Sequence, residues 1–246
     1  MDKVSQSYWD SSYSEYKYSI ANDQVTTWLN NNLKLTPGSA FEAGCFPGRY
    51  LAWLGKHGWN VSGMDLTPRM ESDFRTWLTS ENIRFTRIAR GDVLNYMRTS
   101  SDRYDLVCSF GFIEHFENFL EVIALHGSIL KPGGTLAITT PHFKGGVQKF
   151  LHSSLDRENL ARHYLPSMDP NLWRHQLESN GFTIQWCGYF GNFDFWADKQ
   201  HRNFFQKLVL KGLNIITPFL KWLPDSSLYS PYCGIIATKK SNTIIK

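Results

Sequence analysis

Short apolar runs alternate with helix-like segments along most of the chain, and several of these runs end in small or acidic residues. The stretch FEAGCFPGRYLAWLGKHGWNVSGMDLTP, residues 41–68, shows the pattern most clearly. Its first apolar run stops at Gly44, a helix-like segment follows Gly48, and the second run stops at Asp65. Strands that are separated by helices form parallel sheets with right-handed crossovers. The alternation therefore predicts an α/β fold built on a parallel sheet.

The apolar spacing and the turn residues also predict where the elements lie. Strands are expected at residues 39–44, 60–65, 83–89, 104–110, 134–140, 182–190 and 232–239. Helices are expected at 49–57, from Pro68 to about 80, from about His115 to 130, and at 169–180, where Asp169 caps the helix and Pro170 opens it. The sequence KPGG, residues 131–134, predicts a turn, and residues 142–166 form a polar connector with helical patches.

A chain of 246 residues is long enough for one well-cored domain, so residues 1–246 are expected to form a single domain. Residues 1–37 precede its first strand, and residues 191–231 are an insertion between the last two strands. The four cysteines are scattered without a C-x-x-C pair, so neither a zinc site nor a disulfide framework is predicted, and no metal is expected. Without an apolar signal core or a run long enough to span a membrane, a cytoplasmic location is expected.

The small-residue turn after the first strand is the first candidate binding feature. A dinucleotide motif, G-x-G-x-x-G, would need glycine at Phe46 and Arg49, and both positions fail. What remains is E-x-G-x-x-x-G, formed by Glu42, Gly44 and Gly48. Glycines at such a strand end let the backbone approach a ligand closely.

Two acidic residues follow the next two strands. Asp65 ends the second strand, and its carboxylate suits a ribose diol because it can accept a hydrogen bond from each hydroxyl. Asp92 lies in Gly91-Asp92-Val93 after the third strand and offers a carboxylate to an adenine amine beside an apolar contact. Together with the glycine turn, these residues predict a nucleoside site at the carboxyl ends of the strands.

With these motifs the chain resembles the class I S-adenosylmethionine-dependent methyltransferases. The resemblance rests on FEAGCFPG, GMDLTP, RGDVLNY, YDLVCSFGFIEHF and LKPGGTLAITTP, between about residues 39 and 141, and the strand order extends it to the C-terminus. It implies a seven-stranded, mostly parallel Rossmann-like sheet with helices on both faces and an antiparallel last strand. Residues 182–190 and 232–239 would then be antiparallel neighbours.

The same resemblance implies that S-adenosylmethionine is the cofactor and S-adenosylhomocysteine its product. The glycine turn would line the methionine end, Asp65 would hold the ribose, Asp92 would receive adenine, and residues 110–111 would border the sulfonium. The cofactor-binding residues predicted in this way are Glu42, Gly44, Cys45, Phe46, Gly48, Asp65, Leu66, Asp92, Val93, Phe110, Gly111, Trp9 and Tyr16. Phe46 stands where the family often has a third glycine, so its ring is expected either to narrow the pocket, to stack near the ligand or to weaken binding.

Methyl transfer to a hydroxyl needs an aligned acceptor and a group that takes its proton. His115, beside the expected sulfonium position, is the leading candidate for this base, with a helix cap or a packing role as the alternative. His142, after the fifth strand, is the second candidate, and it is otherwise expected to line the acceptor pocket or a surface loop. His163 and His175 are expected to be ordinary surface histidines.

The N-terminal run SQSYWDSSYSEYKYS places Trp9, Tyr13 and Tyr16 at helical spacing. The resemblance implies that residues 1–37 are a lid over the cofactor, which would exclude water. The alternative is an aromatic face packed on the core. Tyr13 is predicted to bind the acceptor together with His142 and Phe143.

The segments GFIEHFEN, TPHFKGGVQKFLHSSLD and MDPNLWRHQLESNGF are similar to a bacterial group associated with surface-polysaccharide gene clusters, which implies O-methylation of a sugar or glycan hydroxyl. Residues 207–223, KLVLKGLNIITPFLKWL, are apolar with interspersed lysines and suit the surface of a membrane, so a lipid-linked saccharide is a further candidate acceptor. A wall of the acceptor pocket and a dimer contact are the alternatives for this segment.

Other functions remain open at this stage. A small-molecule or lipid O-methyltransferase fits the fold, and so does a non-catalytic cofactor-binding protein. Phe46, in place of a glycine, is the residue that supports the non-catalytic alternative. The missing glycines argue against a nicotinamide-dependent oxidoreductase. Residues 199–246 carry eight Lys and Arg against a single acid, Asp225, which suits an anionic partner or a solvated face. A nucleic-acid partner is not expected, because SFGF stands where such methyltransferases carry an N/D-P-P-Y-type motif.

Overall fold

The structure is a computed structural model, and it describes residues 4–33, 36–198 and 201–241. Residues 1–3 and 34–35 of the predicted lid therefore lie outside the described residues. So do Lys199 and Lys246 of the basic C-terminal segment.

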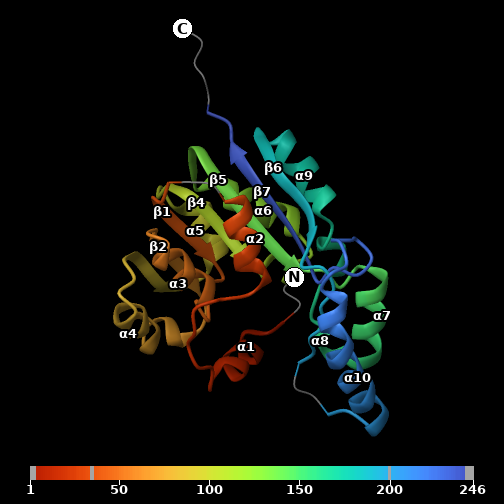
Figure 1. Ribbon diagram of the computed structural model, residues 1–246. Coiled ribbons are helices and arrows are strands. Elements are labelled where there is room, and N and C mark those ends of the chain that lie inside the picture. The colour runs from red at the N-terminus through yellow and green to blue at the C-terminus, as the bar shows by residue number, and fades with distance from the viewer. Residues whose placement is uncertain (1–3, 34–35, 199–200, 242–246) are drawn as a thin grey trace.

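Seven strands form a single sheet in the order β3-β2-β1-β4-β5-β7-β6 (Figure 1). The strands are β1 Ser39–Ala43, β2 Asn60–Asp65, β3 Phe85–Arg90, β4 Tyr104–Phe110, β5 Leu130–Pro141, β6 Phe182–Phe190 and β7 Tyr232–Lys239. β1 to β5 pair in parallel, whereas β7 is antiparallel to both β5 and β6. The order of the strands reverses between β1 and β4, and this arrangement confirms the predicted Rossmann-like sheet with a reversed last strand.

The helices connect or flank these strands. They are α1 Gln6–Tyr13, α2 Gln24–Asn32, α3 Arg49–Lys56, α4 Asp73–Ser80, α5 Val93–Thr99, α6 Phe119–Ser128, α7 Gly146–Leu155, α8 Arg157–Ala161, α9 Pro170–Ser179 and α10 Phe204–Leu220, with short 3₁₀ turns η1 Pro68–Met70, η2 Ile113–His115 and η3 Leu165–Ser167. The predicted cap of α9 is confirmed, because the Asp169 carboxylate accepts a hydrogen bond of 3.1 Å from the Asn171 amide.

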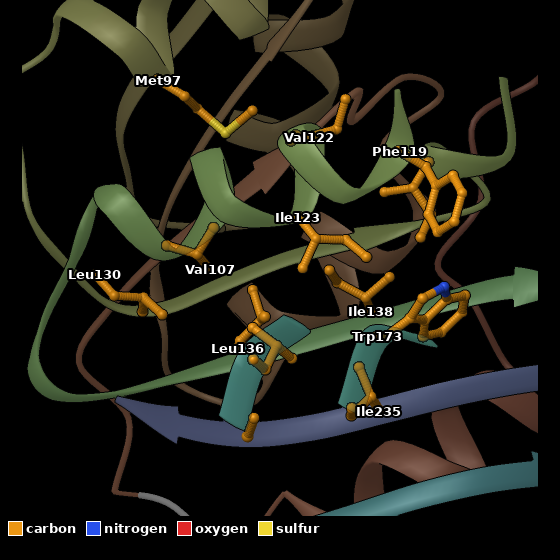
Figure 2. Close-up of a cluster of buried hydrophobic side chains, with 14 of the residues drawn as sticks. Met97, Val107, Phe119, Val122, Ile123, Leu130, Leu136, Ile138, Trp173 and Ile235 are labelled. Carbon is orange, nitrogen blue, oxygen red and sulfur yellow. The ribbon is translucent and has the colours of Figure 1, made fainter. Parts of the chain in front are cut away.

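The two faces of the sheet bury separate apolar clusters. Side chains of α5, α6 and α9 cover one face, where Ile123 and Trp173 pack against Ile138 and Ile235 of the strands (Figure 2). Side chains of α2, α3 and α4 cover the other face. Successive strand residues alternate between the clusters, as the pleat of a strand requires: Val107 belongs to the first, and Leu106 and Cys108 belong to the second. Helices on both faces leave the carboxyl ends of the parallel strands free to form a site.

Three local expectations need correction. The helix expected from Pro68 to about 80 is broken into η1 and α4, because the chain leaves helical geometry at Ser72, the N-cap of α4. The helix expected from about His115 begins only at Phe119, because Phe116 is extended and places His115 in the separate turn η2. The residues of KPGG lie within β5, as a bulge between the pairs Tyr104–Leu130 and Leu106–Thr135.

The insertion between β6 and β7 contains α10, which contacts α7 (Figure 1). Thr217 is the single buried residue of this 17-residue helix. Among the described residues, no helix combines the length and the apolar character that crossing a bilayer would require.

The turn after β1 generates a prediction about stability. Gly48 has a φ of +81°, and a Cβ added there would lie 2.1 Å from the ring of Phe74, which is fully buried. We expect Gly48→Ala to destabilise the protein by about 1–3 kcal/mol, because it adds both backbone strain and a clash in the core. Urea unfolding followed by circular dichroism measures this change.

Gly212 in α10 is the matched control, because a Cβ added there meets no atom within 4 Å. We expect Gly212→Ala to stabilise the protein by about 0.5–1 kcal/mol, as alanine does in place of a glycine within a helix. Equal unfolding free energies for Gly48→Ala and the unmodified chain would show that the turn does not need glycine.

Candidate active site

A cleft of about 370 Å³ opens at the carboxyl ends of β1, β2, β3 and β4. Its walls come from the glycine turn, from the residues that follow the other three strands, and from α1 of the N-terminal segment. The sequence-predicted residues that line it are Trp9, Tyr13, Glu42, Gly44, Cys45, Phe46, Gly48, Asp65, Leu66, Asp92, Val93, Phe110, Gly111 and His115. The structure thus brings to one place residues that the sequence separates widely.

The turn of residues 44–48 is held against the end of β2. The amides of Gly44 and Cys45 both donate to the carbonyl of Met64, at 3.1 and 3.4 Å. Gly44 has a φ of +62°, and a Cβ there would lie 2.3 Å from the ring of Phe112, so a side chain has no room. The turn therefore presents bare backbone to the cleft, as a closely approaching ligand requires.

Asp65 is fixed at the tip of β2 by two backbone amides. The Phe46 amide donates to its Oδ2 at 3.2 Å, and the Thr67 amide donates to its Oδ1 at 3.0 Å. Burial raises the pKa of Asp65 to about 6, although both amide bonds favour the ionised form. Each carboxylate oxygen keeps a lone pair for a further donor, such as a hydroxyl in the cleft.

Two other acids line the cleft. Asp92 caps α5, where its Oδ1 accepts hydrogen bonds from the amides of Leu94 and Asn95 at 2.9 and 3.1 Å. Glu42 is buried, and its Oε2 has no hydrogen-bond partner within the described residues. Burial and the nearby Asp65 charge raise the pKa of Glu42 well above its usual value. Glu42 therefore places a carboxyl group that resists ionisation in the wall of the cleft.

The side chain of Phe46 packs with other aromatic rings. It is buried against Tyr13 and Tyr18, with ring centroids 5.0 and 6.0 Å away, and the guanidinium of Arg69 lies 5.3 Å from its ring. Arg69 in turn donates to the carbonyls of Tyr13 and Tyr16. Phe46 thus joins the glycine turn to the N-terminal aromatic residues and forms part of the cleft wall.

His115 lines the cleft together with Phe110 and Gly111. Its Nδ1 is 3.2 Å from the carbonyl oxygen of Arg162, so this nitrogen carries the proton and Nε2 has a free lone pair. Burial lowers the pKa of His115 to about 4, and the ring is therefore neutral at pH 7. The ring of Trp9 meets it edge-on, with centroids 5.1 Å apart.

Three predicted residues do not line the cleft. His142 is buried with Nε2 3.0 Å from the carbonyl oxygen of Ser227, and Phe143 is buried between His152 and His163. The reason is that the His142 amide donates to the Pro231 carbonyl, which holds this segment beside the start of β7. Tyr16 packs on Tyr13 next to the cleft, with centroids 6.3 Å apart.

The expectation that His163 is an ordinary surface residue is wrong. Its ring is mostly shielded and lies 5.0 Å from the ring of His115, and its Nδ1 is 2.7 Å from the Asn159 carbonyl oxygen. Glu114 is buried beside both histidines, and burial raises its pKa to about 8. Polarity and sequence position gave no sign of this cluster, because its members come from two separate segments.

Sequence reasoning also missed part of the cleft wall. The omitted residues are Val4, Gln6, Pro47, Arg49, Tyr50, Gly91, Leu94, Phe112 and Phe116. Arg49 and Tyr50 directly follow the glycine turn, so their position in the sequence was a usable signal. Both bind the carboxylate of Asp23, at 2.7 and 3.0 Å, and Asp23 also caps α2.

Asp65 generates a prediction about pH. Ribose hydroxyls of the cofactor expected from the sequence would donate to the ionised carboxylate, so protonation of Asp65 competes with binding. Because its pKa is about 6, we expect the affinity for S-adenosylhomocysteine to be constant above pH 7 and to fall about tenfold per pH unit well below pH 6. Isothermal titration calorimetry between pH 5 and 8 measures this dependence. In Asp65→Asn, whose side chain cannot ionise, the fall in affinity below pH 6 should be absent.

Comparison with solved structures reveals the same fold in several methyltransferases. A SAM-dependent methyltransferase from Archaeoglobus fulgidus is 20% identical, with a TM-score of 0.57, over 87% of this chain and 93% of its own. The magnesium protoporphyrin IX methyltransferase of Synechocystis PCC 6803 with bound SAH is 16% identical, with a TM-score of 0.57, over 96% of this chain and 95% of its own. A putative sarcosine dimethylglycine methyltransferase from Galdieria sulphuraria is 16% identical, with a TM-score of 0.59, over 88% of this chain and 85% of its own.

A search of curated proteins finds no significant match. The model of one protein family, described as a methyltransferase domain, matches residues 18–214, which include the glycine turn, Asp65, Asp92 and His115. This match covers most of the chain, and the sheet order and the cleft agree with it. The chain belongs to this methyltransferase-domain family.

Proposed function

We propose that the protein is an S-adenosylmethionine-dependent O-methyltransferase that acts on a hydroxyl of a sugar or glycan. The observation that carries this proposal is the single cleft in which the glycine turn, Asp65, Asp92 and His115 meet. The glycine turn, Asp65 and Asp92 suit a nucleoside ligand. His115 suits a hydroxyl acceptor, which needs a neutral base.

The proposed cofactor position follows the cleft from β3 to β4. Asp65 holds the ribose, and Asp92 with Val93 receives adenine. The turn of residues 44–48 faces the amino-acid tail, and Phe110 with Gly111 lies beside the sulfur. The backbone bonds that fix the Asp65 carboxylate support this arrangement, because they leave one lone pair on each oxygen for the ribose. Glu42, Cys45, Phe46 and Leu66 complete the cleft wall around it.

S-adenosylmethionine supplies a methyl group on a positively charged sulfur, and the C–S bond breaks as the acceptor oxygen bonds to the methyl carbon. We propose that Nε2 of His115 takes the proton of the acceptor hydroxyl. The Nδ1 contact with the Arg162 carbonyl supports this role, because it leaves Nε2 as the acceptor atom. The edge-on contact of Trp9 limits how far the imidazole can turn.

The N-terminal segment is proposed to act as a lid, with Trp9 and Tyr13 on its inner side and Tyr16 packed behind Tyr13. The support is that α1 has no buried residue of its own and yet contributes Gln6, Trp9 and Tyr13 to the cleft wall. Such a helix is held mainly by its contacts across the cleft, so it can open and close over a ligand.

The glycan acceptor is supported by the sequence likeness described above and by the aromatic wall. The stacked rings of Trp9 and Tyr13, with centroids 5.6 Å apart, offer an apolar surface to the face of a sugar ring near His115. His142 and Phe143, which were also predicted to bind the acceptor, are not part of this proposal, because both are buried away from the cleft.

Two substitutions separate cofactor binding from proton transfer. We expect His115→Ala to lower turnover about 100- to 10,000-fold and to leave the affinity for S-adenosylhomocysteine within a few-fold, as loss of a base does. Asp65→Ala should instead weaken that affinity about 10- to 100-fold, the value of a charge-assisted hydrogen bond.

Mass spectrometry of candidate glycans, incubated with an isotopically labelled methyl donor, measures turnover, and calorimetry measures affinity. His175→Ala, an exposed histidine of α9, is the control and should alter neither quantity. If the unmodified protein released no heat with either form of the cofactor, the proposed function would be wrong. Unchanged turnover in His115→Ala would remove His115 from the mechanism.

A second proposal concerns α10 and the residues after it, which form an exposed apolar surface. Its most exposed side chains are Phe204, Phe205, Phe219 and Trp222, and Trp222 is 91% exposed. Lys207, Lys211 and Lys221 lie among them, without an acid between residues 203 and 223. Apolar side chains interspersed with lysines match an anionic lipid surface, so we propose peripheral contact with the inner face of a membrane, where a lipid-linked acceptor would be presented.

Vesicle sedimentation tests this contact. We expect the protein to sediment with vesicles of phosphatidylglycerol and phosphatidylcholine and to remain in solution with phosphatidylcholine alone. The double substitution Phe219→Ser and Trp222→Ser should reduce the bound fraction at least about fivefold, since it removes two large apolar side chains from the lipid. Leu172→Ser, at an exposed position of α9, is the control. Equal binding of the double variant and the unmodified protein would place the membrane contact elsewhere.

A further inference from the structure

Three potential metal ligands lie close together beside the cleft: Glu114, His115 and His163. One carboxylate oxygen and one ring nitrogen from each histidine all lie within 4.8 Å of one another. Within residues 4–33, 36–198 and 201–241, no other group of three or more His, Cys, Asp and Glu side chains is close enough to hold an ion. We propose that these three residues bind a divalent transition-metal ion beside the methyl-transfer site.

Both imidazoles are oriented as metal ligands should be. Nδ1 of His115 faces the Arg162 carbonyl at 3.2 Å, and Nδ1 of His163 faces the Asn159 carbonyl at 2.7 Å. A carbonyl oxygen only accepts hydrogen bonds, so each Nδ1 carries the proton and each Nε2 keeps its lone pair. Histidines that bind metals commonly have their second nitrogen held in this way, which fixes the ring and its tautomer.

The carboxylate of Glu114 supplies the third ligand and needs a partner. Glu114 is 1% exposed, and its Oε2 has no hydrogen bond within the described part of the chain. A buried polar atom without a partner is costly, and a bound cation would remove that cost. This unsatisfied oxygen is independent of the histidine geometry and points to the same ligand.

The backbone holds the two ligand-bearing segments together. The Tyr164 amide donates to the Glu114 carbonyl at 2.7 Å, which joins the residue after His163 to the turn that contains Glu114 and His115. Three ligands of a tetrahedral zinc ion, bonded at about 2.1 Å, lie about 3.4 Å apart, whereas the present atoms lie within 4.8 Å of one another, so the side chains need to close by up to about 1.4 Å. Small rotations of the side chains within their present rotamers supply such a movement while the backbone and the two Nδ1 contacts stay in place.

The donor set indicates the kind of ion. Two imidazoles and one carboxylate suit Zn²⁺, Co²⁺, Fe²⁺ or Mn²⁺, whereas Mg²⁺ and Ca²⁺ favour sites made of oxygen ligands. Three protein ligands leave at least one coordination position open, as in catalytic zinc sites. Because His115 lines the cleft, the open position is expected to face the acceptor.

This inference rests on the proposed methyl transfer and changes the role of His115 within it. When Nε2 of His115 binds an ion, it cannot also take the proton of the acceptor. The ion would instead bind the hydroxyl oxygen and lower its pKa, so that the O–H bond breaks and its proton passes to water. His115 can therefore act either as the base or as a metal ligand, but not as both at once. Only the metal site needs His163.

Cobalt binding tests the site without any substrate. The untagged full-length protein, stripped with EDTA and dialysed, is titrated with CoCl₂ while visible absorption and calorimetric heat are recorded. We expect one equivalent to bind and to give the d–d absorption of a cobalt ion with nitrogen and oxygen ligands. His163→Ala should weaken binding at least about tenfold, and so should Glu114→Gln, which replaces an ionisable carboxyl group by a neutral amide of similar volume, since each removes one of three ligands. His175→Ala is the matched control and should bind like the unmodified protein.

Each result is decisive. If the unmodified protein gave no cobalt absorption, or if both ligand variants bound cobalt as tightly as the unmodified protein, the site would not exist. Circular dichroism checks that the variants are folded, and Glu114→Gln provides the test if His163→Ala is unstable. Calorimetry with S-adenosylhomocysteine on the same stripped protein separates the two proposals. Cofactor binding without cobalt binding would overturn only the metal site, and loss of cofactor binding alone would overturn the proposed function.

Discussion

The hydrogen bond from the Phe46 amide to the Asp65 carboxylate connects the two loops on which the cleft depends. β1 and β2 are parallel neighbours, so their carboxyl ends lie at the same edge of the sheet, and this bond joins the glycine turn to the acid across that edge. The amides of Gly44 and Cys45 strengthen the connection through the Met64 carbonyl. α3 begins directly after the turn, and the cleft wall is therefore fixed before any ligand is present.

The electrostatic character of the cleft follows from burial. Asp65 accepts two amide hydrogen bonds and has a pKa of about 6, whereas one oxygen of Glu42 has no partner in the described part of the chain and its pKa is well above its usual range. Burial thus opposes ionisation at both acids, and the two amide hydrogen bonds offset part of this effect at Asp65. His115, which also lines the cleft, is neutral at pH 7 because burial lowers its pKa to about 4.

The sheet and the strand-end residues could be predicted because both depend on local patterns. β2, β4, β6 and β7 have the expected bounds, since each is an uninterrupted extended run between turn residues. Features that depend on long-range contacts could not be predicted. The break between η1 and α4 accompanies bonds from Arg69 to Asp73 and to the N-terminal carbonyls. The place of His163 beside His115 likewise depends on how two connectors pack.

The position of β7 has a consequence for how the chain acquires its structure during synthesis. β7 is the last strand to be made, yet it lies between β5 and β6 and pairs with both along their length. Ile235 and Ala237 belong to the same apolar cluster as α6 and α9, so that cluster stays incomplete until residue 239 has left the ribosome. Strands β1 to β5 can pair earlier, but the edge of β5 that β7 later covers is then unpaired. Until β7 is in place, this edge is open to pairing with strands of other chains.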